Sequence, residues 1–494
     1  MRFGSPSAPE THPDSVQAMS HMSPEEFRTH GHRLIDWVAD YWESLPALDV
    51  QSDIEPGDIR ALLPSQAPEQ PEPFDAVLDD LDRVVTGGLT HWQAPGWFAY
   101  FPANASFPSI LGELAAAGLG QQGMLWATSP AATEIEAHVL DWLVELLGLP
   151  EAFATTGTGG GVMQMSASDS THTALVVARE QARSRADAGG ALPRTDDLVV
   201  YASTQAHSSV EKGARVAGYR HVRLVDVDAT YAMRPDALSA AVAADLAGGL
   251  TPAAVVSTIG TTGTTAVDPL RAIAAIARPA GMWHHVDAAY AGSAMICPEL
   301  RWMQDGVDLV DSYTFNPHKW MFTNFDANVF YVVDRAPLLE TLSILPPYLR
   351  NKASESGEVL DYRDWHVPLG RRFRALKLWF VLRSYGAQGI RHHIRKHLAW
   401  AAGLRDRLDA DPRFTLVAPS PLALVTFRHS GGAEATRRLT EAVNASGHSR
   451  VTASVLDDEP FIRVSIGATT TREEHVHRLW HLLDSAAEPV EEPA

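Results

Sequence analysis

Residues 312–320 read Ser-Tyr-Thr-Phe-Asn-Pro-His-Lys-Trp and place a lysine directly after a short apolar strand. Proline cannot continue a central strand, so we expect the strand to end before Pro317 and Lys319 to lie just beyond its carboxyl end. The amine of a lysine can condense with a carbonyl cofactor, although most lysines are solvated surface residues. The chain has 494 residues and only five lysines, so few side chains can carry this chemistry.

Upstream of this lysine, short apolar runs rich in β-branched residues alternate with helical patterns. This alternation predicts a mostly parallel sheet with helices on both faces, which binds ligands at the carboxyl ends of its strands. After residue 378 the pattern predicts a smaller α+β unit. The expected strands are 198–202, 222–227, 253–259, 282–286 and 309–315, with helices at 208–217, 235–247 and 269–278; the smaller unit has strands near 422–428 and 461–466 and a helix over 471–485.

Two further polar side chains fall at expected strand ends. Asp287 follows an apolar run and can pair with a protonated pyridine nitrogen, or it can simply cap the next helix. His207 follows another apolar run and can stack on a planar cofactor, although a lone histidine is more often structural.

A glycine-rich segment, 157–168, ends in Ser166-Ala167-Ser168 before a helical pattern. Converging backbone amides and two hydroxyls at a helix start suit a phosphate group. The segment lacks the Gly-Lys-Ser/Thr of a nucleotide P-loop. Together, a phosphate site, a histidine, an aspartate and a lysine form the set that pyridoxal phosphate requires.

The composition excludes several other classes of protein. A net charge of −20 does not favour nucleic acid or an anionic membrane as a partner. The single cysteine, Cys297, cannot form an internal disulfide and fits a reducing cytoplasm. No apolar run is long enough for a membrane span, and the start lacks a signal-peptide pattern. His284 and His285 point to opposite faces of a strand, so we expect no metal site there.

The N-terminal region differs from the rest of the chain in its composition and hydrophobic pattern. Residues 1–22 are rich in Ser, Pro and His and predict a disordered extension. Ser23-Pro24-Glu25-Glu26 has a capping-box pattern with proline at the first helical position, and it predicts an amphipathic helix that runs to Leu45. Six prolines within 46–73 predict an extended connector rather than a domain core.

Six motifs of the chain resemble those of group II pyridoxal-phosphate decarboxylases, and they are most similar to those of aromatic-L-amino-acid decarboxylases. The resemblance extends from Ser23 to about residue 485. It implies a fold type I enzyme: a large α/β domain with a mostly parallel sheet, an N-terminal helical dimerisation segment and a small C-terminal α+β domain. The motifs are residues 90–102, 129–131, 205–209, 285–292, 316–320 and 368–373.

The resemblance also implies roles for individual residues. Lys319 matches the lysine that forms a Schiff base with pyridoxal phosphate, Asp287 the partner of the ring nitrogen, and His207 the histidine stacked on the ring. Other matched positions surround the cofactor: Ala289 beneath the ring, Ser166, Ala167, Ser168, Ser312 and Asn316 around the phosphate, His318 beside it, and Thr258. The positions matched to the substrate pocket are Trp92, Tyr100, Phe101, Pro102, Met124 and Gly370.

Tyr348 matches the mobile-loop tyrosine that protonates the substrate carbon after carbon dioxide leaves. The implied reaction converts an aromatic L-amino acid (tryptophan, tyrosine, phenylalanine, DOPA or 5-hydroxytryptophan) to its amine. Alternatives are an aromatic aldehyde synthase, in which this tyrosine or the stacked histidine is typically replaced, a decarboxylase of a non-aromatic amino acid, and a non-catalytic binding protein. Because Tyr348 and His207 are both present, amine formation is the preferred interpretation.

Two positions depart from the family pattern, and together with Gly370 they bear on the substrate. Ala103 stands where threonine is common, and Met124, two residues after Gln122, replaces a phenylalanine of animal members. Gly370 removes bulk from the pocket and is compatible with an indole.

The resemblance implies a homodimer with shared active sites. The domains expected on this basis are an extension over 1–22, a dimerisation segment over 23–104, a cofactor-binding domain over 105–377, a small domain over 378–486 and a tail over 487–494.

Overall fold

The computed structural model describes residues 21–185, 190–344 and 359–487, and the chain divides into two compact units, Met1–Ala94 and Pro95–Ala494. The capping box predicted at Ser23 is confirmed, with Pro24 beginning helix α2. No residue of α2 is buried within the chain. The helices of the first unit are α2 (Pro24–Ser44), η1 (Leu45–Ala47), α3 (Asp58–Leu62), α4 (Phe74–Asp80), η2 (Leu81–Val85) and η3 (Thr86–Gly88).

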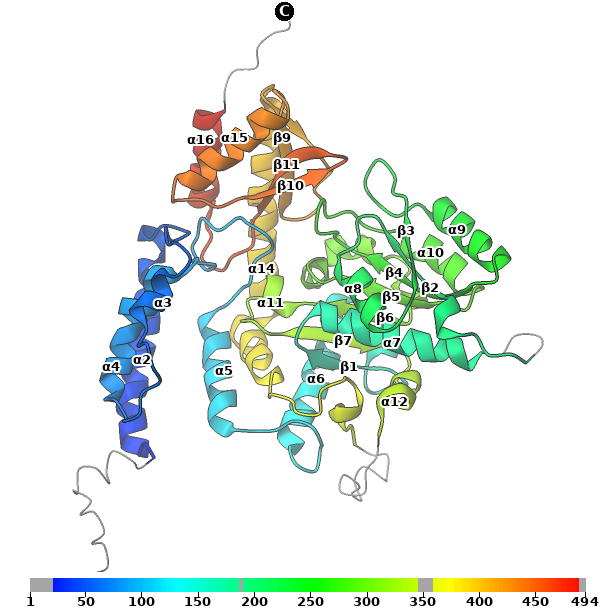
Figure 1. Cartoon of the computed structure of the whole chain (residues 1–494), viewed down its shortest axis with the longest axis horizontal. Coiled ribbons are helices and arrows are strands. Elements are labelled where there is room, and N and C mark those ends of the chain that lie inside the picture. The colour runs from blue at the N-terminus through cyan, green and yellow to red at the C-terminus, as the bar shows by residue number, and fades with distance from the viewer. Residues whose placement is uncertain (1–20, 186–189, 345–358, 488–494) are drawn as a thin grey trace, which may run out of the picture. The chain divides into compact units, whose positions relative to one another are not determined.

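The second unit is built on a seven-stranded sheet with the order β1-β7-β6-β5-β4-β2-β3 (Figure 1). Strands β3, β2, β4, β5 and β6 pair in parallel, and β7 pairs antiparallel with both β6 and β1. The predicted mostly parallel sheet is therefore confirmed, and five of its strands were predicted. The strands are β1 (Gly160–Gln164), β2 (Leu198–Ser203), β3 (His221–Val225), β4 (Thr251–Thr258), β5 (Trp283–Asp287), β6 (Ser312–Phe315) and β7 (Asn328–Val332).

Helices cover both faces of this sheet because its strands are apolar on both faces. On β2, Val200 and Ala202 share a core with helices α7 and α8, whereas Val199 and Tyr201 share a different core with α9 and α10. Neighbouring residues of a strand point to opposite faces, which explains the two cores. The helices are α5 (Phe107–Leu119), α6 (Pro130–Leu147), α7 (Ala167–Ser184), α8 (Ser209–Val216), α9 (Pro235–Ala247), α10 (Leu270–Ala277), α11 (Pro317–Trp320) and α12 (Ala336–Leu342).

A second sheet has four antiparallel strands in the order β10-β11-β9-β8. Helix α14 (Ala375–Ala410) contacts α5 and α6 beside the large sheet and also β8, β9 and α16 (Figure 1). The expected domain boundary at 377/378 falls inside this helix. The remaining elements are β8 (Phe414–Leu416), β9 (Leu424–His429), α15 (Ala433–Ala445), β10 (Thr452–Leu456), β11 (Glu459–Ser465) and α16 (Glu473–Ala486).

The glycine-rich segment does not have the expected arrangement of converging backbone amides, because Gly160–Gln164 forms the buried strand β1. A Cβ at Gly161 would lie 2.5 Å from the ring of Tyr331. A Cβ at Gly159 would lie 2.3 Å from the carbonyl oxygen of Val332. These glycines therefore allow β1 to pack closely against β7 rather than converging on an anion.

Across the described ranges, no helix combines the length and apolarity that crossing a membrane requires.

Candidate active site

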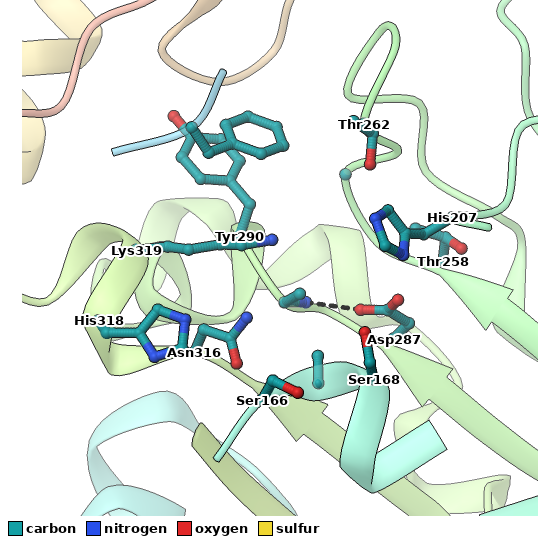
Figure 2. A pocket seen from close by; sticks show the side chains of 14 residues that line it. Ser166, Ser168, His207, Thr258, Thr262, Asp287, Tyr290, Asn316, His318 and Lys319 are labelled. Atoms are coloured by element: carbon teal, nitrogen blue, oxygen red, sulfur yellow. Dashed lines mark hydrogen bonds between the residues drawn. The ribbon is translucent and has the colours of Figure 1, made fainter. Parts of the chain in front are cut away.

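A cavity of about 210 Å³ opens at the carboxyl ends of the large sheet (Figure 2). The segments that follow β1, β2, β4, β5 and β6 each contribute residues to it, as expected for a ligand site on a sheet of this kind. Its lining residues are Phe101, Ser166, Ala167, Ser168, His207, Thr258, Gly260, Thr262, Asp287, Ala289, Tyr290, Asn316, His318 and Lys319.

Lys319 reaches the cavity from α11, the single turn of helix that follows β6. Its Nζ lies 5.2 Å from the centre of the Phe101 ring. Burial lowers the pKa of Lys319, Asp287 opposes this shift, and Arg463 adds to it. A lowered pKa increases the fraction of neutral amine, which is the nucleophilic form. The turn is held from behind by Asn104, whose Nδ2 donates a hydrogen bond to the carbonyl oxygen of Lys319 (3.2 Å).

The start of α7 forms one side of an anion site. Ser166 is the N-cap, and its Oγ accepts a hydrogen bond from the backbone N–H of Asp169 (3.3 Å). The backbone N–H groups of Ala167 and Ser168 lie in the first turn, where no carbonyl of the helix can accept from them. The positive end of the helix dipole and these free donors favour a phosphate here.

Asn316 and His318, in the segment that follows β6, complete this anion site. The Nδ2 of Asn328 donates to the Oδ1 of Asn316 (2.7 Å), which leaves the amide N–H groups of Asn316 for a ligand. The backbone N–H of Ala327 donates to the Nδ1 of His318 (2.9 Å), so the Nε2 of the neutral ring carries the proton. Burial lowers the pKa of His318 to about 3, which keeps the ring neutral.

Asp287 ends β5 with its side chain in the cavity and is 4% exposed. The backbone N–H of Ala289 donates to its Oδ1 (2.9 Å), the bond drawn in Figure 2. On the neighbouring strand, the Thr258 backbone N–H donates to the buried carboxylate of Asp268 (2.8 Å). The Oγ1 of Thr258 is buried, and within the described residues it makes no hydrogen bond.

His207 projects into the cavity from the turn between β2 and α8 (Figure 2). The backbone N–H of Ser209 donates to its Nδ1 (3.1 Å), and the Ser209 hydroxyl lies 2.8 Å from the same atom. Burial lowers the pKa of His207, Asp287 opposes this shift, and Lys319 adds to it.

One wall of the cavity is aromatic. The rings of Phe101 and Tyr290 stack with centres 4.0 Å apart, and Tyr290 stacks in turn on Trp320 at 4.7 Å. The guanidinium of Arg463 lies 5.3 Å from the centre of the Phe101 ring. Arg463 is 3% exposed, and burial lowers its pKa to about 10. Its position on β11 gave no signal in the sequence, because nothing in its local pattern distinguishes it from a surface arginine.

Two of the predicted catalytic and cofactor-binding residues are not placed in this cavity. Ser312 is fully buried at the start of β6, where its hydroxyl accepts from the indole N–H of Trp283 (2.7 Å) and contacts the Nδ1 of His285 (2.9 Å). Tyr348 lies outside the described residues.

Of the residues predicted to bind the substrate, one lines the cavity and the others do not. Phe101 lines the cavity, whereas Pro102 and Met124 are absent from its lining. Tyr100 is 56% exposed and has φ +56°, and Gly370 is exposed with nothing within 4 Å of the place of a Cβ. Trp92 belongs to the first compact unit.

Three lining residues were missed by the sequence analysis. Gly260 and Thr262 follow β4, and Tyr290 follows β5. The strand-end argument that selected Asp287 applies equally to the segment after Thr258 and would have found Thr262.

These groups fit pyridoxal phosphate. The anion site suits its phosphate, Asp287 its ring nitrogen, and the amine of Lys319 its aldehyde. The buried hydroxyl of Thr258 has no partner inside the described parts of the chain and is free to bind it. Among those parts there is also no group of three or more His, Cys, Asp or Glu side chains that could hold a metal ion.

Comparisons with known proteins agree with this site. The pyridoxal-dependent decarboxylase conserved domain matches residues 56–430. The chain is 44% identical to phenylacetaldehyde synthase of Arabidopsis thaliana, covering 96% of this chain and 98% of that protein. It is 43% identical to tryptophan decarboxylase 2 of Oryza sativa subsp. japonica, over 95% and 96%. The crystal structure of Oryza sativa TDC with PLP and tryptamine superimposes with a TM-score of 0.92 at 39% identity, over 95% and 99%.

Fold and site together define a pyridoxal-phosphate enzyme of fold type I. The chain belongs to the pyridoxal-dependent decarboxylase family and is a carboxy-lyase. Its relatives include both aromatic amino acid decarboxylases and aldehyde synthases.

Proposed function

We propose that the chain decarboxylates an aromatic L-amino acid to the corresponding amine, with Lys319 as the lysine that binds the cofactor. The observation that carries this proposal is the aromatic wall beside that lysine. The Phe101 ring lies 5.2 Å from Nζ and is held by its stack on Tyr290, so a flat apolar side chain would find an aromatic surface next to the reacting carbon. A relative named for tryptophan decarboxylation, 43% identical over nearly the whole chain, supports the same class of substrate.

Pyridoxal phosphate supplies an electron sink for the bond that breaks between the substrate carbon and its carboxylate. Asp287 pairs with the ring nitrogen and holds a proton there. The α7 start, Asn316 and His318 hold the phosphate and so fix the ring in the cavity. Lys319 would hold the cofactor between turnovers, and its amine would be released when the substrate amine takes its place. His207 would lie beside the ring in this cavity, and Tyr348 would donate the proton to the substrate carbon.

The test is a product assay on the purified holoenzyme with tryptophan, tyrosine, phenylalanine, DOPA and 5-hydroxytryptophan. Amine, aldehyde and hydrogen peroxide are measured together, with glutamate and 2,4-diaminobutyrate as non-aromatic controls. We expect amine from at least one aromatic substrate and none from the controls. Turnover of the controls alone would contradict the proposed substrate class.

Aldehyde synthesis is the second candidate, because a relative 44% identical to the chain is a phenylacetaldehyde synthase. Such a reaction would give aldehyde and peroxide in amounts equal to the carbon dioxide released. The presence of both Tyr348 and His207 favours the amine.

We also infer that the enzyme is a homodimer with shared sites. Helix α5 exposes Phe107, Leu111 and Leu114 at helical spacing, each at least 45% exposed in the single chain. Met124 and Gly370, which do not line the cavity of their own chain, are then candidates for the wall of the second subunit's site. Sedimentation equilibrium at micromolar concentration tests this inference: a fully active monomer would contradict it, and L111E should give a monomer with little activity.

A further inference from the structure

His207, one of the two histidines that line the cavity, is held at its Nδ1 by a single residue, Ser209. Ser209 begins α8 and is 5% exposed, and it presents two groups to the Nδ1 of His207. The backbone N–H donates at 3.1 Å, and the hydroxyl lies at 2.8 Å. A backbone N–H can only donate, so the Nδ1 of the neutral ring is an acceptor and the proton is on Nε2. His207 therefore offers an N–H donor to the cavity in its neutral form.

The hydroxyl differs from the backbone N–H because it can also accept. When the ring gains a proton on Nδ1, the backbone N–H of Ser209 faces another N–H and opposes the change. The hydroxyl can rotate, accept from Nδ1–H and make a charge-assisted hydrogen bond. His207 can then take up a proton without turning its Nε2–H away from the cavity.

His318 provides an internal contrast. A backbone N–H, that of Ala327, also donates to its Nδ1, and no hydroxyl contact to that atom is present among the described residues. The pKa of His318 is lowered to about 3, chiefly by burial, so this histidine stays neutral beside the anion site. In both histidines a backbone N–H donates to Nδ1 and fixes the ring. Of the two, only His207 also has a hydroxyl beside Nδ1, that of Ser209, which can accept a hydrogen bond when Nδ1 is protonated.

We propose that Ser209 is a positioning residue that fixes His207 as an Nε2–H donor to the cavity and lets it accept a proton on Nδ1 during the reaction. The inference rests on the proposed function, in which His207 covers the reacting centre and Tyr348 supplies the proton. A group that gives its proton to the substrate carbon is left with a charge that a hydrogen-bond donor stabilises, and the Nε2–H of His207 is such a donor in the cavity. The charged groups that bear on the pKa of His207 are Asp287, which raises it, and Lys319, which lowers it.

The test compares S209A with S208A in the holoenzyme. Ser208 is exposed and its side chain makes no capping hydrogen bond, so S208A is a matched control in the same turn. The pKa of His207 is measured from the pH dependence of its acylation by diethylpyrocarbonate, read by mass spectrometry of the peptide that contains it. This readout does not require turnover, so it stands even if the proposed function fails the product assay.

In S209A the backbone N–H remains and the acceptor for the protonated ring is lost. We expect the pKa of His207 to fall by about half a unit to one unit, because charge-assisted hydrogen bonds are roughly twice as strong as neutral ones. The kcat for amine should fall by about 3- to 10-fold, with a larger share of aldehyde, while S208A matches the wild type in both measurements. An unchanged or raised pKa of His207, or a lowered pKa with the wild-type ratio of amine to aldehyde, would overturn the inference.

Discussion

The floor of the cavity and its rim are built in different ways. On the floor, Thr258, Asp287, Asn316 and His318 are each at most 5% exposed and are fixed by strand register and backbone hydrogen bonds. On the rim, His207 is partly accessible to solvent within the cavity and is held by one turn. Buried groups with single partners hold one arrangement, whereas exposed groups can respond to what binds. The floor therefore suits a resident cofactor, and the rim suits the substrate and the proton.

The largest effect on turnover is expected from removing the reactive amine of Lys319. We expect K319A to lose turnover by at least roughly 10³-fold, since the covalent link to the cofactor disappears. Borohydride reduction of the wild type should attach the cofactor to Lys319, as peptide mapping would show. K212A, which alters an exposed lysine on α8, serves as the control and should keep full activity. Labelling of any of the other four lysines would contradict the assignment.

The second effect concerns the charge on the floor. D287N keeps an oxygen that can accept from the Ala289 N–H but removes the carboxylate that would pair with the ring nitrogen. Breaking a buried charge pair costs about 2–5 kcal/mol, so kcat should fall by roughly 10²-fold or more. Asp311 is a matched control, because its carboxylate also accepts a backbone N–H, that of His284 (2.7 Å), away from the cavity. If D311N lost as much activity as D287N, the loss would reflect folding rather than the cofactor.

The third effect concerns proton delivery to the substrate carbon and should change the product more than the rate. Y348F removes the hydroxyl proposed to protonate the substrate carbon. We expect carbon dioxide release to continue while amine falls by about tenfold and aldehyde, ammonia and peroxide take its place. Product analysis under air and under nitrogen distinguishes the two routes, since the aldehyde requires oxygen. Wild-type amine formation without aldehyde would show that another group donates the proton, and His207 would be examined next.

Part of the floor could be predicted from strand ends because these are local signals, whereas Thr258 and Asn316 were expected only from the family resemblance. Apolar runs followed by Asp287 or by Pro317-His318-Lys319 show where parallel strands stop, and parallel strands bring their carboxyl ends to one edge. The same reasoning located β2 to β6 within a few residues. It failed for the glycine-rich strand β1, since glycines needed for close packing against β7 look like a turn.

Contacts between distant segments had no such signal. The stack of Phe101 on Tyr290 and the approach of Arg463 to it join residues far apart in the chain. The pattern around each residue reveals burial at most, not its partner. Ser312 shows the opposite error: a residue matched to the phosphate region is bonded to Trp283 and His285 instead of lining the cavity.

The smallest effect on the reaction is expected from substituting the buried His397, which lies away from the cavity. This substitution should change the stability at low pH and leave turnover at pH 7 unchanged. Burial lowers the pKa of His397 to about 3, and the indole N–H of Trp320 donates to its Nδ1 (3.0 Å). In the unfolded chain a histidine titrates near 6.5, so below that pH the unfolded state binds more protons than the folded one. The stability that this neutral ring contributes is therefore complete above about pH 6.5 and declines as the pH falls toward 3.

H397N isolates this contribution, because an asparagine oxygen can replace Nδ1 as the acceptor and does not titrate. Asp268, whose pKa burial raises to about 6, acts in the opposite direction in every variant and cancels in the comparison. Between pH 7 and pH 5 we expect the unfolding free energy of the wild type to fall by roughly 1–2 kcal/mol more than that of H397N. The melting temperature of the wild type should therefore fall more steeply over this pH range. The same substitution at the exposed His448 is the control and should leave the slope of the wild type. Equal slopes for the wild type and H397N would mean that His397 does not stay neutral in the folded protein.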